Sequence, residues 1–418
     1  MYDFTTLGAV VGLAIAIVLI IKKVHPAYSL ILGALLGGII GGGGLATTVN
    51  TMVSGAQSMM SSVLRIMTSG ILAGALIRTG SAQKIAETIV DKMGERLALA
   101  AIALATMIIC AVGVFIDISV ITVAPIALAI GKRAKLNKQS LLLAMIGGGK
   151  AGNIISPNPN TIAASEAFGV DLTSLMFKNL VPAVFALAMA ILLSSALSRK
   201  NGLEVAQGDI ETSDAALPGF LPAIVGPLVV IVLLALRPIA GISIDPLIAL
   251  PVGGLVCMAV TGNIKGVVPI TEFGLSKVVG VSILLIGTGT IAGIIKASAL
   301  QYDVIALLEK LNMPAFVLAP LAGILMAGAT ASTTAGATIA AQTFAPTLIQ
   351  QGVPALAAGA MVHAGATVVD SLPHGSFFHA TGGSVNMSIG ERMKLIPFEA
   401  CVGLTATVVS VVMFLIFG

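Results

Sequence analysis

Long apolar runs, separated by short polar segments, are the feature that most limits what this chain can fold into. Several are close to the ~20 residues that an α-helix needs to cross a bilayer, for example residues 56–77, 179–197 and 395–418. Only 10% of the 418 residues are charged, whereas a soluble domain carries roughly a quarter. A soluble enzyme is therefore excluded, and the chain is predicted to be an all-α, polytopic membrane protein.

Composition also narrows the possible partners. The net charge of +4 follows from basic loops at the cytoplasmic face and indicates no nucleic-acid partner. Cys110, Cys257 and Cys401 all lie inside apolar runs, so neither a disulfide framework nor a metal site is expected. No glycine-rich loop is followed by the Lys-Ser or Lys-Thr pair of nucleotide-hydrolysing proteins. No cofactor is therefore expected.

Basic residues mark the predicted cytoplasmic loops: Lys22–Lys23, residues 132–138 and Arg199–Lys200. Because positively charged loops stay on the cytoplasmic side, the N-terminus is expected outside. The run before the first loop lacks a small-residue cleavage site and is predicted to be an anchor helix. The polar residues 201–217 are predicted to be a cytoplasmic linker between two halves, residues 1–200 and 218–418.

The two halves align weakly but at a nearly constant offset. Ala124-Pro125 matches Ala345-Pro346, and Leu180–Pro182 matches Leu395–Pro397. Charge counting places Lys277 at the cytoplasmic start of a span whose counterpart in the first half starts outside. The halves are therefore predicted to be inverted repeats.

Each half also contains an interrupted apolar segment, at residues 153–161 and 369–375. Pro157 and Pro159 remove amide donors and break a helix in the first of these. Residues 97–131 form either two spans or one span and a re-entrant hairpin whose tip lies near Asp117. Non-helical backbone at membrane depth survives only where it lines a cavity or is buried in protein. Inverted repeats with broken helices are typical of secondary transporters, whose site lies between the breaks.

The candidate substrate-binding residues lie at the two breaks and at the two hairpin tips. Broken helices leave amide hydrogens free at their N-termini, and hydroxyl and amide side chains add neutral donors that suit a carboxylate and its hydroxyl groups. Such side chains can also simply bond a neighbouring helix, but their clustering at both breaks favours a site. The candidates are Ser119, Lys150, Asn153, Ser156, Asn158, Asn160, Thr161, Ser332, Thr333, Thr334 and Ser371.

Ionisable side chains at predicted membrane depth are functional hypotheses by default. Burial disfavours the charged form of a carboxyl group, so Asp117 and Asp370 are candidates for proton coupling; the alternative is that each caps a half-helix. His374 follows Asp370 closely and can share its proton or bind substrate. Lys150 is either a counter-ion for an anion or for Asp117, or a snorkelling residue. Arg65 is interpreted as paired or snorkelling.

Three stretches resemble the gluconate permease family of the ion transporter superfamily. They are Leu-Ala-Gly-Ala-Leu at residues 72–76, Ser-Pro-Asn-Pro-Asn-Thr at 156–161 with Gly-Val-Asp-Leu at 169–172, and Val-Asp-Ser-Leu-Pro-His-Gly at 369–375. The sequence departs from the family pattern at Gly375, where the family has Asn, and at Asn158 and Asn160, where smaller residues are usual. These departures leave the substrate open.

The resemblance implies a proton-coupled importer of gluconate or related sugar acids and hydroxy-carboxylates in the cytoplasmic membrane. It also implies a homodimer whose protomers combine a scaffold domain with a mobile, elevator-type transport domain. Two alternatives remain: a sodium-coupled carrier of organic anions with the same fold, and a cation/proton antiporter. An intramembrane protease would need a nucleophile motif, which is absent, so no enzyme activity is expected.

Overall fold

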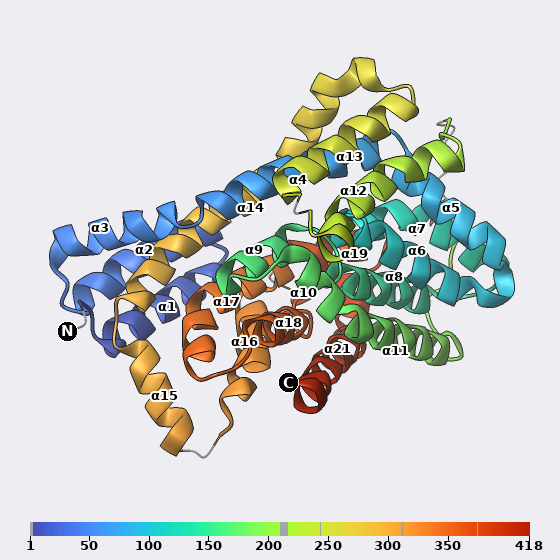
Figure 1. Cartoon of the computed structure of the whole chain (residues 1–418). Helices are drawn as coiled ribbons and strands as arrows, with labels where there is room; N and C mark the ends of the chain where they lie inside the picture. Colours follow the sequence, from blue (N-terminus) through green and yellow to red (C-terminus); the bar gives the residue numbers. More distant parts are fainter. Residues whose placement is uncertain (1–2, 210–215, 243, 311–312, 374) are drawn as a thin grey trace.

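The computed structural model is built almost entirely of helices and describes residues 3–209, 216–242, 244–310, 313–373 and 375–418 (Figure 1). Among these residues the β contacts are two isolated bridges, Phe4–Ser298 and Asn137–Glu204. The prediction of an all-α fold is therefore confirmed.

The helices divide between the two halves of the sequence. The first half contains α1 Thr6–Ile21, α2 Pro26–Ile40, α3 Gly44–Gln57, α4 Met60–Arg78, α5 Ser81–Met93, α6 Ala98–Ala111, α7 Ile116–Arg133, α8 Lys138–Asn153, α9 Pro159–Phe168, α10 Leu172–Lys178 and α11 Leu180–Ser198. The second contains α12 Phe220–Ala240, α13 Pro246–Val260, α14 Val267–Lys296, α15 Leu300–Lys310, α16 Leu318–Thr330, α17 Thr333–Gln350, α18 Ala355–Gly365, α19 Ser376–Gly383, α20 Ile389–Met393 and α21 Ile396–Phe417.

The order of elements from α4 to α11 recurs from α14 to α21. In each series a long helix and a shorter one precede a two-helix hairpin, α6–α7 or α16–α17. An interrupted helix follows, α8–α9 or α18–α19, and then a short helix and a long final helix. This recurrence agrees with the weak sequence repeat; the inverted orientation of the halves stays a prediction.

Helices α1–α4 and α12–α14, which we call the arm, pack through small residues. The 30-residue helix α14 lies alongside α3 and α4, as Figure 1 shows. A Cβ atom added to Gly55 would lie 2.2 Å from the carbonyl oxygen of Gly289, and one added to Gly274 would lie 2.0 Å from that of Gly70. Any larger side chain at these positions would push the helices apart, which is why membrane helices use glycine at such contacts.

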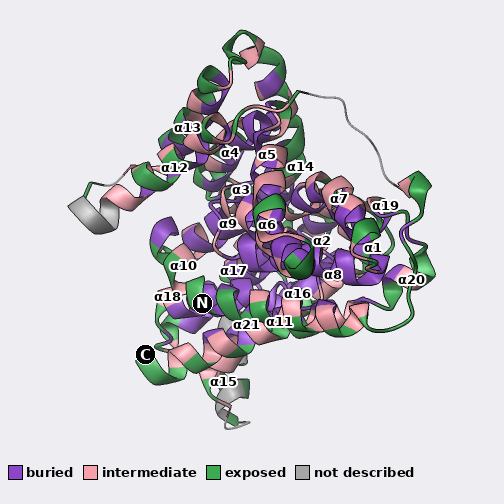
Figure 2. Ribbon diagram, turned by 90° about the vertical axis from the view of Figure 1, so that its right-hand side faces the viewer, coloured by how far each residue is buried: buried purple, intermediate pink, exposed green. Residues whose placement is uncertain are grey.

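Helices α6–α11 and α16–α21 form a second group, which we call the body. Every residue of α8 is buried, and so is α18 from Ala357 to Gly365. Figure 2 shows buried residues gathered in the interior around α8 and α17, with exposed residues toward the outer ends. The two helices that lead into the breaks are therefore the best packed, and they hold the polar segments beyond them in place.

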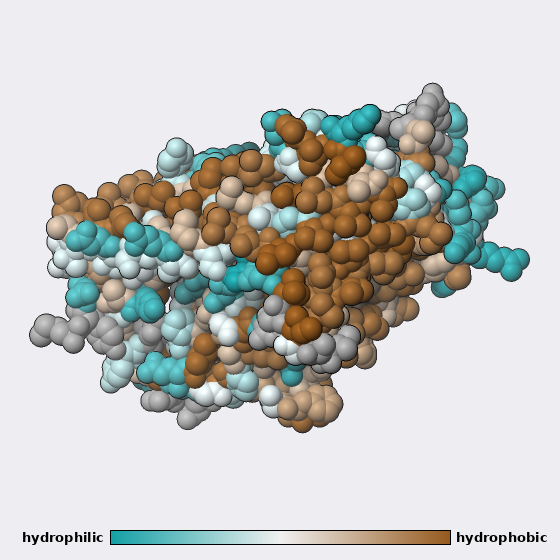
Figure 3. Space-filling model, turned by 45° about the horizontal axis from the view of Figure 1, so that its top comes forward, coloured by the Kyte–Doolittle hydropathy of each residue, from teal (hydrophilic) through white to brown (hydrophobic). Residues whose placement is uncertain are grey.

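Four helices among the described residues are long and apolar enough to cross a membrane: α4, α11, α14 and α21. A bend of 107° separates α5 from the helical segment Glu95–Ala111. Figure 3 shows apolar side chains over a broad area of one face, with polar side chains gathered at one end. Apolar surface of this extent requires lipid or protein to cover it, as expected of a multi-pass membrane protein.

One boundary predicted from the sequence is wrong. Lys277 was expected at the start of a span, but α14 begins at Val267 and Lys277 lies inside the helix. Residues 267–276 carry a single charge, Glu272, and their one proline, Pro269, lies in the first turn, where a helix tolerates it. The helix therefore continues through Lys277. Because Lys277 does not lie in a loop, it no longer supports the prediction that the two halves are inverted.

Candidate functional site

A cavity of about 420 Å³ lies where polar segments of the body face α14 and the start of α2. This volume falls in the range of about 300–1,000 Å³ that is usual for small-molecule sites. Six of the predicted residues line it: Asp117, Asn153, Asn160, Ser332, Thr333 and Thr334. They come from the start of α7, the end of α8, the start of α9 and the turn between α16 and α17, so the structure brings three of the four polar segments together there.

Three asparagines at the first break form one hydrogen-bonded cluster. Asn158 precedes α9, and its Oδ1 accepts from the backbone amides of Asn160 and Thr161, at 3.0 and 3.2 Å. This capping interaction fixes the orientation of the Asn158 amide, because a backbone N–H can only donate. The Nδ2 of Asn158 therefore points the other way and donates to Oδ1 of Asn153 at 2.6 Å.

The same cluster leaves two polar atoms free. Oδ1 of Asn153 also accepts from Nδ2 of Asn160 at 3.0 Å, so the orientation of all three amides follows from the cap. Within the described residues, Asn153 Nδ2 and Asn160 Oδ1 have no hydrogen-bond partner, although Asn153 and Asn160 are only 2% and 4% exposed. Buried polar groups are normally paired. This unpaired donor and acceptor belong to two residues that line the cavity.

The second break is organised around an ion pair. The Lys150 ammonium lies 2.6 Å from Oδ1 of Asp370, and each side chain is 1% exposed. Asp370 also accepts from Thr333 Oγ1 at 2.5 Å and from Ser371 Oγ at 3.1 Å. Lys150 donates in addition to the carbonyl of Thr367. Three further groups, Thr333, Ser371 and the Thr367 carbonyl, thus complete the hydrogen bonding of the carboxylate and its counter-ion, as a buried charge requires.

The remaining predicted residues that the structure describes do not line the cavity. The Ser119 hydroxyl donates to the carbonyl of Phe115, one turn earlier, and that of Thr161 donates to Asn158 Oδ1 at 3.3 Å. Ser156 is buried, and its hydroxyl has no partner among the described residues. His374 lies outside the described residues. The roles assigned to these residues from the sequence stay predictions.

Several cavity-lining residues were missed by the sequence analysis: His25, Ser276, Lys277, Ser376 and Phe377. Lys277 carried the clearest signal, a lone charge with apolar residues on both sides, but it was interpreted as the end of a loop. Gly375, one of the departures from the family pattern, has a steric reason. A Cβ atom there would lie 2.3 Å from the carbonyl oxygen of Ala331, in the turn between α16 and α17.

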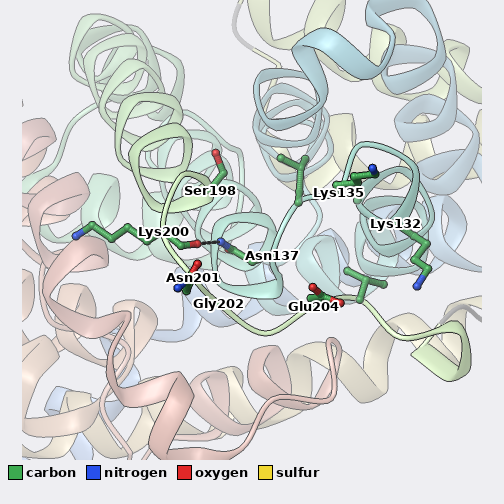
Figure 4. Close-up of a pocket in the computed structure, with 11 residues that line it drawn as sticks. Lys132, Lys135, Asn137, Ser198, Lys200, Asn201, Gly202 and Glu204 are labelled. Carbon is green, nitrogen blue, oxygen red and sulfur yellow. Dashed lines mark hydrogen bonds between the residues drawn. The ribbon is translucent and has the colours of Figure 1, made fainter.

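A larger hollow, of about 740 Å³, lies near the loops after α7 and α11. Its lining includes Lys132, Lys135 and Lys200, but Figure 4 shows that these three side chains point in different directions. Asn137 ties the two loops together by donating to the carbonyls of Leu197 and Lys200. The hollow therefore has no convergent set of polar groups, unlike the cavity beside α14.

Two interrupted helices that meet near a polar cavity, in a protein covered by apolar helices, define a membrane transporter. The chain belongs to the GntP family of permeases, whose family model matches residues 4–417. It is 52% identical over its whole length, and that of the relative, to an uncharacterized transporter of Haemophilus influenzae.

Two characterised relatives are more distant. The high-affinity gluconate transporter of Escherichia coli is 26% identical over 41% of this chain and 39% of its own length. The D-serine transporter DsdX of the same species is 21% identical over 87% of this chain and 88% of its own length. Among solved structures, the YdaH transporter of Alcanivorax borkumensis has a similar fold, with a TM-score of 0.67 and 16% identity over 89% of this chain and 88% of that one.

Proposed function

We propose that the protein is a proton-coupled symporter that carries gluconate, or a related sugar acid or hydroxy-carboxylate, across the cytoplasmic membrane. The observation that carries the proposal is the free donor and acceptor of Asn153 and Asn160 in the cavity. A donor beside an acceptor matches a hydroxyl group, which both donates and accepts. The names of two relatives, for gluconate and D-serine, support a small hydroxylated carboxylate as substrate.

The proposal assigns the coupled proton first to Asp117, because this carboxylate lines the same cavity. Asp370, which forms an ion pair with Lys150, is the second candidate; a proton there would break the ion pair. Coupling requires that the carrier loaded with both proton and substrate moves more readily than the carrier loaded with one. The remaining polar residues at the breaks would hold the substrate.

The movement proposed is of the elevator type: the body, which carries both breaks, slides against the arm. Because α14 and α2 supply one wall of the cavity and the body supplies the other, such a movement would open the cavity to one side of the membrane at a time. We further propose that the arms of two protomers form a homodimer and stay fixed in the membrane.

The test is accumulation of labelled gluconate in proteoliposomes, driven separately by an inward proton gradient and an inward sodium gradient. Proton-driven accumulation that an uncoupler abolishes is the expected result. Asp117→Asn should then abolish accumulation against a gradient but leave exchange of bound gluconate, whereas Asp91→Asn, at an exposed carboxylate on α5, should behave like the wild type. Accumulation driven by sodium alone would overturn the proton assignment and favour the sodium-coupled alternative.

A further inference from the structure

We propose that Lys277 is the cation that binds the substrate carboxylate, and that it makes the carrier selective for carboxylates over uncharged polyols. This inference rests on the proposed function of the cavity as the substrate site. It assigns the recognition of charge to a residue of the arm. Asn153 and Asn160, which line the cavity at the α8–α9 break, are neutral amides and cannot supply it.

The position of Lys277 first calls for an explanation. It lies inside the long apolar helix α14, between Ser276 and Val278. A charged side chain within a membrane helix is costly unless it faces a cavity or a partner, and such residues mark substrate or ion pathways. Lys277 lines the cavity and is exposed, so its ammonium has access to a ligand there.

Three other buried or half-buried cations are already engaged. Lys150 pairs with Asp370, Arg392 with Glu399, and Arg65 with both Glu166 and Asp245. Within the described residues, Lys277 has no carboxylate within 4.0 Å; its ammonium lies 4.9 Å from the centre of the Phe273 ring. It is also the one lysine or arginine among the residues that line the cavity.

The groups around Lys277 complete a site for a carboxylate with hydroxyl groups. Among the described residues, three titratable side chains line the cavity: His25, Asp117 and Lys277. The N-termini of α7 and α17 also lie at the cavity wall, and such helix ends favour a negative charge. A carboxylate held by Lys277 would leave the hydroxyl groups of the substrate to Asn153 and Asn160 on the body.

Lys277 makes this arrangement selective for carboxylates. A hydroxyl group of an uncharged polyol accepts at most a hydrogen bond from the ammonium, whereas a carboxylate adds the attraction between two opposite charges. Gluconate and D-serine, the compounds named for two relatives, share a carboxylate and a hydroxyl group, which agrees with a cation that anchors the carboxylate.

The experiment measures binding of gluconate and of uncharged gluconamide to the purified full-length protein, for the wild type, Lys277→Met and Lys277→Arg. Lys277→Met should weaken gluconate binding by about 10- to 100-fold, the usual effect of losing a hydrogen bond to a charged group. It should weaken gluconamide binding clearly less, because gluconamide has no negative charge for Lys277 to attract. Lys277→Arg should retain the preference for gluconate. Lys296→Met, at an exposed lysine at the end of the same helix, is the matched control.

Each outcome decides one question. Equal gluconate affinity in Lys277→Met and the wild type would overturn the role of Lys277, and so would equal losses for gluconate and gluconamide, which indicate a structural effect. If Lys277→Met does not fold, Lys277→Gln takes its place in the same comparison. A wild-type protein that bound no member of a panel of small hydroxy- and amino-carboxylates would instead overturn the proposed function itself.

Discussion

The two interrupted helices occupy the same place in the recurring order of elements, yet they treat their polar groups in opposite ways. At the α8–α9 break, a cluster of neutral amides leaves a donor on Asn153 and an acceptor on Asn160 without partners. At the α18–α19 break, the carboxylate of Asp370 is fully occupied by Lys150, Thr333 and Ser371. The first break therefore leaves polar groups without partners, whereas the charged group of the second break is paired within the protein.

The short helices beyond the breaks are anchored differently as well. On α9, Glu166 pairs with Arg65 of α4, which also holds Asp245 of α13, so the first broken helix is tied to the arm. On α19, Thr381 accepts from Arg392. Arg392 pairs in turn with Glu399 of α21, so the second broken helix is tied within the body.

The largest expected effect comes from breaking the ion pair between Lys150 and Asp370. Asp370→Asn leaves the Lys150 ammonium buried without a counter-ion, and removing one partner of a buried pair typically costs about 3–5 kcal/mol. We expect a strong loss of thermal stability in detergent, measured as the fraction of monodisperse protein that remains after heating.

The double variant Lys150→Met/Asp370→Leu removes both charges and should recover most of that stability, because a buried pair can often be replaced by apolar residues without loss. A stable Asp370→Asn protein that binds gluconate but no longer accumulates it would contradict a purely structural role for the Lys150–Asp370 pair. It would instead make the second break the site of proton coupling.

A smaller effect is expected at the α8–α9 break. Asn153→Leu removes the free donor and the oxygen that accepts from Asn158 and Asn160, so gluconate affinity should fall by about 10- to 100-fold. Asn179→Leu is a matched control. Asn179 is equally buried and has no side-chain partner among the described residues, but it does not line the cavity. Titration calorimetry should separate the two variants; similar affinities would show that an unpaired buried amide does not by itself mark the ligand site.

Much of this arrangement follows from local sequence. Apolar runs predict helices, Pro157 and Pro159 predict a break, and the polar residues at the breaks and tips predict where a cavity forms. The pairing of Lys150 with Asp370 was not predicted, because the two residues are far apart in the chain and Asp117 was an equally plausible partner. The place of Lys277 was missed because a lone charge is compatible with a loop end or with the interior of a helix.

The tie between α9 and the arm should affect rate rather than binding. Arg65 and Glu166 are partly exposed, and such pairs are worth up to about 1 kcal/mol, so Glu166→Gln should change the rate of gluconate exchange by roughly 2- to 5-fold and leave affinity unchanged. Glu391→Gln removes an ion pair with Lys394 that lies within the body and should leave the rate unchanged. Equal rates for the wild type and Glu166→Gln would show that the Arg65–Glu166 pair does not affect the movement of the body.

The smallest effect concerns the linker, where Asp209 accepts a hydrogen bond from Asn386 in the loop that follows α19. Partial burial alone would raise the pKa of Asp209, but hydrogen bonds from Lys138, the Ala206 amide and Asn386 hold that pKa below its usual value. The ionised carboxylate therefore stabilises the docked linker at neutral pH, and this stabilisation is lost as the pH falls below the ordinary Asp value of about 3.9. Limited proteolysis of the linker should accelerate over that range in the wild type. Asp209→Asn should be cut faster already at neutral pH and show little further change on acidification; a wild-type profile in this variant would remove Asp209 as the tether.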